Sequence, residues 1–104
     1  MNILNNVNII GMCESSHGSS IYLFDNETHN KYTIKLRDSI HEVSSKLIRE
    51  LEDKTCMGTV YLNGGDNNVI LFGTEGENWL LFDETNNLYN IKRDSVIDYF
   101  KNFS

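Results

Sequence analysis

Three histidines and two cysteines are the side chains of this chain best suited to bind a metal ion or act as nucleophiles. They are His17, His29, His41, Cys13 and Cys56. No two of them have the spacing of a zinc motif, and nothing in the local sequence supports a nucleophile built from Cys13 and His17. We therefore expect no metal, no cofactor, histidines on surface loops, and reduced cysteines that are small buried hydrophobic residues.

Paired carboxylates are the other candidates for chemistry, because two acids held close together can act as a general acid and base. Asp25 lies near Glu27, and Asp83 precedes Glu84. Both pairs fall where a strand runs into a turn, and there such side chains usually bind backbone N–H groups. The structural interpretation is favoured, and we expect that the chain is not an enzyme.

The two carboxylate pairs recur because the chain contains an internal repeat. Residues 21–43 and 79–99 align over 21 pairs with one-residue gaps at Asn26 and Leu36, and 12 pairs are identical. The identities include Leu-Phe-Asp, Glu-Thr, Ile-Lys and Arg-Asp-Ser. A repeat of this quality indicates one structural unit that occurs twice.

The first half predicts strands followed by a helix. Residues 2–13 alternate with Ile3, Val7 and Ile9 on one face, and shorter strands are expected over 21–25 and 31–36. Ser39 and Glu42 form a capping-box pattern ahead of apolar residues at helical spacing, which predicts a helix over 39–53.

The second half predicts the same plan. Strands are expected over 55–62, 68–73, 79–83 and 88–92, and a second helix from Ser95. The expected fold class is α+β, with two antiparallel meanders, each followed by a helix and related by a pseudo-two-fold. Residues 1–104 form one domain, with repeat halves 1–54 and 55–104. Each half is ββββα if the first strand is divided in two, and otherwise the first half is βββα.

Charge is unevenly distributed along the chain, whose net charge is −6. No Lys or Arg occurs between Lys54 and Lys92. Five acidic residues lie there: Asp66, Glu75, Glu77, Asp83 and Glu84. This balance argues against nucleic acid as a partner and suits a basic protein, although acidity also simply aids solubility. Neither a bilayer-spanning run nor a signal peptide is recognisable, so we expect a cytoplasmic protein without membrane contact.

The repeated Leu-Phe-Asp, Glu-Thr and Arg-Asp-Ser units make the chain resemble the Whirly and PUR-type folds, which contain two ββββα repeats. Size and acidity also make it resemble small bacterial immunity proteins of contact-dependent-inhibition and polymorphic-toxin systems. That resemblance implies a heterodimer with a cognate toxin carrying a basic nuclease domain, and a homodimer is compatible with it. The expected partner-binding residues are Asp66, Glu75, Glu77, Trp79 and Glu84, with Trp79 either an anchor or a core residue.

Two alternatives stay open. The first is a Whirly- or PUR-like binder of single-stranded nucleic acid, which needs its basic residues on one face: Lys31, Lys35, Arg37, Lys46 and Arg49. Aromatic side chains could then stack on bases, the candidates being Tyr22, Phe24, Tyr32, Tyr61 and Tyr89. The second alternative is a phage-encoded inhibitor of a defence nuclease, which shares the acidic mechanism.

Overall fold

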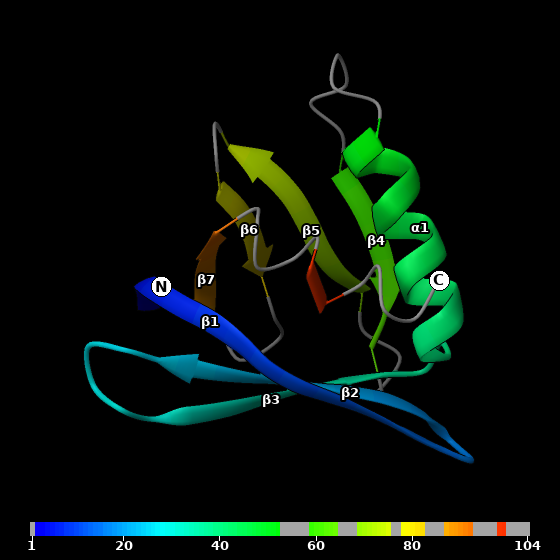
Figure 1. Cartoon of the computed structure of the whole chain (residues 1–104), viewed down its shortest axis with the longest axis horizontal. Coiled ribbons are helices and arrows are strands. Elements are labelled where there is room, and N and C mark those ends of the chain that lie inside the picture. Colours follow the sequence, from blue (N-terminus) through cyan, green and yellow to red (C-terminus); the bar gives the residue numbers. More distant parts are fainter. Residues whose placement is uncertain are drawn as a thin grey trace.

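The computed structural model describes residues 2–52, 59–64, 69–75, 78–82, 87–92 and 98–99 of the chain. Within them the protein is one seven-stranded sheet and one helix (Figure 1). The elements are β1 (Asn2–Ser15), β2 (Gly18–Asp25), β3 (Lys31–Leu36), α1 (Ile40–Glu52), β4 (Thr59–Asn63), β5 (Val69–Glu75), β6 (Asn78–Phe82) and β7 (Asn87–Lys92).

The predicted fold class of two ββββα units is wrong. The strand order is β3-β2-β1-β7-β6-β5-β4, and β1 and β7 pair in parallel, so both meanders belong to one mixed sheet. Three strands precede α1, and the repeated strands β2 and β6 belong to the same sheet, with β1 and β7 between them. Local patterns define each meander, but they do not specify that two meander edges hydrogen-bond to each other. Pairing β1 with β7 satisfies two edges that would otherwise be open.

β1 joins the two meanders with different parts of its length. Residues 2–7 pair with β7, residues 7–15 pair with β2, and Val7 has a partner on both sides. Figure 1 shows the result, with β1 crossing between the β2–β3 hairpin and the other four strands.

β1 contains two bulges, and the first of them overturns the predicted alternation of Ile3, Val7 and Ile9. The register advances three residues on β1 against two on β7 between Leu4 and Val7, and two against one on β2 between Ile9 and Gly11. Each extra residue reverses which face the following side chains occupy. The buried face therefore carries Leu4, Val7 and Ile9, whereas Ile3 is 55% exposed.

The sheet curls until its two edge strands meet at one end. Leu36 at the end of β3 forms a bridge with Gly64 beyond β4, and the Arg37 N–H donates to the Asn63 carbonyl at 2.7 Å. Inside the curl, the rings of Tyr32 and Tyr89 meet edge to face with centroids 5.5 Å apart. The buried core contains Leu4, Val7, Ile9, Ile21, Leu23, Ile34, Leu36, Val43, Leu62, Tyr89 and Ile91.

The helix predicted over 39–53 is confirmed as α1. Ser39 caps it, since its Oγ accepts the Glu42 N–H at 3.2 Å. Ile40, Val43 and Ser44 are buried and attach the helix to the sheet. Most of the second predicted helix lies outside the described residues. Only Asp98 and Tyr99 of it are described, and both are helical.

Candidate functional site

The residues expected to bind a partner are only partly described. Asp66, Glu77 and Glu84 lie outside the described residues, as do Asp83 and Cys56. Glu75 ends β5 opposite Asn78, and Trp79 on β6 is the register partner of Ile91. The structure thus gives the strand positions of Glu75 and Trp79, and their part in binding a partner stays a prediction.

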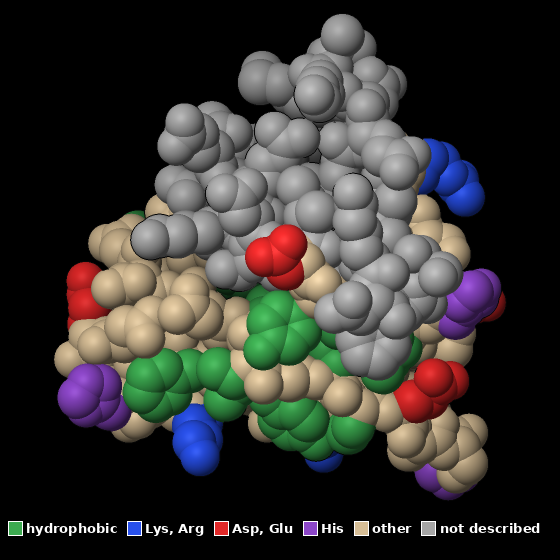
Figure 2. All heavy atoms as spheres, in the orientation of Figure 1, with side chains coloured by type: hydrophobic (Ala, Val, Ile, Leu, Met, Phe, Trp, Pro, Cys, Tyr) green, Lys and Arg blue, Asp and Glu red, His purple; other side chains and the backbone are tan. Residues whose placement is uncertain are grey.

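The structure brings together a different group on the outer face of the first meander. β2 and β3 bury alternate residues, and their remaining positions pair as Phe24 with Lys31 and Tyr22 with Thr33. Lys35 follows in the next row, opposite Ser20. We call Tyr22, Phe24, Lys31, Thr33 and Lys35 the outer patch. Figure 2 shows hydrophobic and basic side chains close together along the lower edge, where Figure 1 places β1–β3.

Tyr22 lies across β1 within the outer patch. Its partner in register is Gly11, and a Cβ added to that glycine would lie 3.7 Å from Tyr22 Cδ2. The Tyr22 hydroxyl also hydrogen-bonds the Cys13 Sγ at 3.0 Å, and this bond is the main reason that the pKa of the tyrosine is raised. Tyr22 is 36% exposed. Cys13 is exposed too, which corrects its expected burial, because the second bulge changes its face.

Phe24 is paired with a second ring. His29 stacks on it with centroids 5.9 Å apart and 10° between the planes. His29 has a φ of 62°, a left-handed conformation that directs the 25–30 turn back toward β2. The backbone thus presents an aromatic pair beside Lys31.

The first carboxylate pair has a structural role. Asp25 is 1% exposed, and its carboxylate accepts the Glu27 N–H at 2.9 Å and the Thr28 hydroxyl at 2.9 Å. The Glu27 N–H lowers the pKa of Asp25 more than burial raises it, and Thr28 adds to the lowering. An ionised carboxylate whose oxygens are already bonded by its own turn is poorly placed to transfer a proton to a substrate.

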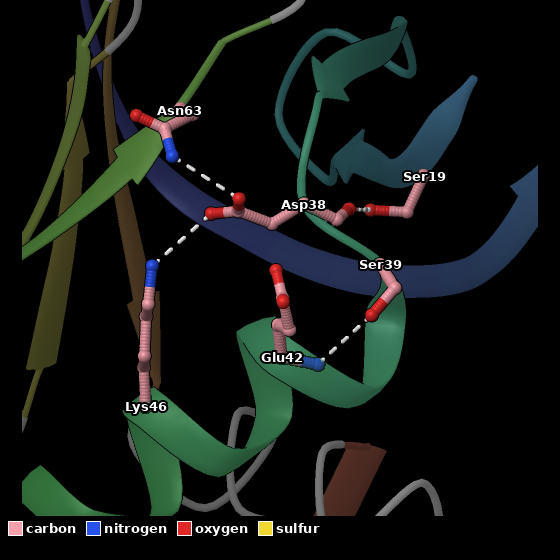
Figure 3. A network of polar contacts seen from close by, with 6 residues as sticks. All are labelled: Ser19, Asp38, Ser39, Glu42, Lys46 and Asn63. Atoms are coloured by element: carbon pink, nitrogen blue, oxygen red, sulfur yellow. Dashed lines mark hydrogen bonds and ion pairs between the residues drawn. The ribbon is translucent and has the colours of Figure 1, made fainter.

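A polar cluster joins both sheet edges to the helix (Figure 3). The Asp38 carboxylate accepts from Asn63 Nδ2 at 3.1 Å and from Lys46 Nζ at 3.2 Å, while the Asp38 carbonyl accepts the Ser19 hydroxyl at 2.7 Å. Burial raises the pKa of Asp38, but the bonds from Asn63 and Lys46 outweigh it and hold the pKa below 3.8. The repeated Arg-Asp-Ser unit therefore has a structural role in the first copy, where Asp38 connects the sheet edges and the helix.

Asp38→Asn should destabilise the protein by about 1–2 kcal/mol at pH 7, because it removes the charge from two hydrogen bonds. The pKa of Asp38 is lower in the folded protein than in the unfolded chain, so its ionised carboxylate stabilises the fold at pH values above the pKa of the unfolded chain. This contribution is lost as the pH falls through the pKa of the folded protein. The difference between wild type and variant should therefore shrink below pH 3.8. Urea unfolding at several pH values measures this difference in stability, with Glu14→Gln as the control at an exposed position. A difference that does not change with pH would contradict the stabilising role of the Asp38 carboxylate.

Beside this cluster lies an open hollow of about 430 Å³. It is lined by Glu14, Ser15, Ser16, His17, Gly18, Arg37 and Ser39. Arg37 lines this hollow, and Lys46 on α1 is bound to Asp38. The five basic residues that the nucleic-acid alternative required therefore do not share one face.

No group of three or more potential metal ligands occurs among the described residues. Within the same part of the chain, no helix combines the length and apolarity needed to cross a membrane. Comparisons with protein-family models, with curated proteins and with solved structures each gave no match. The resemblance to immunity proteins therefore stays a prediction.

Sequence reasoning named Tyr22, Phe24, Lys31 and Lys35 among larger candidate sets, but it did not group them as one patch. Alternation in 21–25 and 31–36 already separates Tyr22 and Phe24 from the buried positions, and Lys31 and Lys35 from Ile34. The predicted aromatic group mixed both faces: Tyr89 is buried and Tyr32 packs on the core. The register of the β2–β3 hairpin was needed to bring the lysines beside the exposed Tyr22 and the half-buried Phe24.

Proposed function

We propose that this chain is a cytoplasmic binding protein of the immunity class, which neutralises a basic nuclease toxin by covering its active site. The observation that carries the proposal is the absence of Lys and Arg between Lys54 and Lys92, where five acidic residues occur. Carboxylates in that stretch would stand in for the phosphates of the toxin's substrate. Opposite charge would also accelerate the encounter of the two proteins.

Two carboxylates of the first half have structural roles. Asp25 and Asp38 are both engaged in bonds that hold the fold, so neither is offered as a contact for the toxin. Of the acidic stretch, Glu75 is the described member, at the end of β5 and opposite Asn78.

Coexpression tests the proposed function directly. Cells that produce the protein encoded immediately upstream of this chain should stop growing, and this chain should restore growth through a heterodimer that purifies intact. A toxic upstream protein that this chain neither binds nor relieves would contradict the proposal.

Charge reversal tests where the toxin binds. Glu75→Lys with Glu77→Lys should weaken the heterodimer at least about tenfold, mainly through slower association, and should reduce its dependence on salt. The matched control, Glu14→Lys with Glu27→Lys, changes the net charge equally, but at exposed positions of the first meander. Equal effects of both pairs on association kinetics would show that net charge, not this site, governs binding.

A further inference from the structure

Asn63 joins the two edges of the sheet with both its backbone and its side chain. Its carbonyl accepts the Arg37 N–H at 2.7 Å, and its Nδ2 donates to the Asp38 carboxylate at 3.1 Å (Figure 3). Gly64 follows it in the chain and forms the bridge with Leu36. We call these contacts the sheet closure. A chemical change at Asn63 would therefore act directly on the bonds that hold the closure together.

Asn63 is also the asparagine of this chain that is best suited to lose its side-chain amide. It alone among the asparagines of the sequence is followed by glycine. The backbone nitrogen of the next residue attacks an asparagine Cγ most readily when that residue has no Cβ to obstruct the approach, and glycine has none. Asn63 is exposed and ends β4, so water and hydroxide can reach it.

We infer that Asn63 is a site of spontaneous deamidation, that the sheet closure slows this reaction, and that the products cannot form the same closure. The Gly64 nitrogen loses its proton to hydroxide and attacks the Asn63 Cγ. A C–N bond forms, the Cγ–Nδ2 bond breaks, and the amide nitrogen takes a proton from water and leaves as ammonia. The remaining five-membered succinimide ring is opened by water at either carbonyl, which gives aspartate or isoaspartate.

The closed sheet opposes the first step of this reaction. Ring formation requires the Asn63 side chain to turn toward the nitrogen of Gly64. In the structure, however, its Nδ2 is bound to Asp38, and the strand backbone is held extended by the bond from the Arg37 N–H. Deamidation therefore proceeds from molecules in which the closure has opened, a local event that costs less free energy than unfolding of the whole domain.

Neither product can restore the closure. Aspartate at position 63 brings a second carboxylate to the place from which Asp38 now accepts a hydrogen bond, and two carboxylates so close oppose each other's ionisation. The Asp38 side chain is 11% exposed, so water screens this repulsion weakly, and Lys46 already binds Asp38. Isoaspartate adds a carbon to the main chain and makes the carbonyl that binds Arg37 part of a free carboxylate. Since ammonia is lost, the change is irreversible.

Incubation at mildly alkaline pH, followed by peptide mapping in a mass spectrometer, measures the reaction at each asparagine. Deamidation should occur first at Asn63 and give two products of equal mass, which is the sign of a ring intermediate. The reaction should be faster in urea than in native buffer. Asp38→Ala should accelerate it in native buffer at least about fivefold, the factor that corresponds to the loss of one hydrogen bond of about 1 kcal/mol.

Thr28→Ala is the matched control for Asp38→Ala. It also removes a hydrogen bond to a carboxylate, that of Asp25, but at the opposite end of the β2–β3 hairpin from the closure. The rate of deamidation should therefore stay close to that of the wild type. If circular dichroism shows that Asp38→Ala is unfolded, the comparison of the wild type in native buffer and in urea decides the same question.

Stability measurements test the consequence of deamidation. The urea midpoint of the wild type should fall as incubation proceeds. The midpoint of Asn63→Gln should stay constant, because a glutamine side chain forms the corresponding larger ring much more slowly. Asn63→Asp should have a lower midpoint than the wild type from the start. Asn30→Asp makes the same change of charge at an exposed loop position and should lower the midpoint less.

Three outcomes would overturn the inference. If Asn63 stayed unmodified in urea, or if another asparagine reacted first, it would not be the site. Equal rates in native buffer and in urea, or equal rates in Asp38→Ala and Thr28→Ala, would show that the closure does not slow the reaction. A deamidated protein with the urea midpoint of the unmodified one would show that the closure forms again. No measurement here uses the toxin, so failure leaves the proposed function untouched.

Discussion

Gly18→Ala should destabilise the protein strongly, because the backbone at Gly18 leaves no room for a methyl group. Gly18 has a φ of 135°, and a Cβ placed there would lie 2.0 Å from the Leu36 carbonyl oxygen and 3.1 Å from Arg37 Cα. Backbone strain costs about 1–3 kcal/mol and overpacking a further 1–3 kcal/mol, so the expected loss is about 2–6 kcal/mol. That is a large part of the ~5–15 kcal/mol that stabilises a domain.

The position of Gly18 explains why the neighbouring backbone cannot simply move away. Gly18 begins β2 after a two-residue turn, and it approaches the residues at which β3 closes against β4. Arg37 is held there by its N–H bond to Asn63. A displacement at Gly18 would therefore disturb the bonds that close the sheet.

Gly11→Ala is the matched control for Gly18→Ala. Gly11 is also a β1–β2 hairpin glycine, but an added Cβ would make an ordinary 3.7 Å contact with Tyr22. The free energy of unfolding of the Gly11→Ala variant should differ from that of the wild type by less than about 1 kcal/mol, since alanine is favoured over glycine within a strand. Urea midpoints measure both variants, and similar losses at the two positions would refute the close approach at Gly18.

The helix and its cap were predictable because everything that specifies them is local. Ser39 lies three residues before Glu42, Ile40 and Val43 share one face, and the observed helix agrees with the expected residues. The role of Asp25 was predictable for the same reason, because its partners Glu27 and Thr28 lie in its own turn.

The sheet was not predictable in the same way, since its decisive contacts join residues far apart in sequence. The pairing of Leu4 with Tyr89 and the bridge from Leu36 to Gly64 have no local signal. The repeat led to the wrong expectation of two separate ββββα units, because similar sequences do not specify whether their strands hydrogen-bond edge to edge in one sheet. The bulge between Leu4 and Val7 lies in the pairing of β1 with β7, and for this reason the face of Ile3 was assigned wrongly.

Three isoleucines of β1 test the bulges with one kind of substitution. Ile9 is 2% exposed, Ile10 is 45% exposed and Ile3 is 55% exposed. Ile9→Ala should cost about 2–5 kcal/mol, because it removes buried methyl groups and leaves a cavity beside Leu23, its partner on β2. Ile3→Ala and Ile10→Ala should each cost less than about 1 kcal/mol, which is the loss of strand propensity alone.

The comparison separates the structure from uninterrupted alternation. Without the bulge between Leu4 and Val7, Ile3 would share the face of Val7 and Ile9, and Ile3→Ala would be as costly as Ile9→Ala. With it, Leu4→Ala should cost more than Ile3→Ala, although the two residues are adjacent and both lie near the start of β1. Since all three isoleucine variants lose the same β-branched side chain, propensity cancels and burial remains. Denaturant unfolding measures the loss of stability in each variant. If Ile3→Ala cost as much as Ile9→Ala, β1 would have a register without its first bulge.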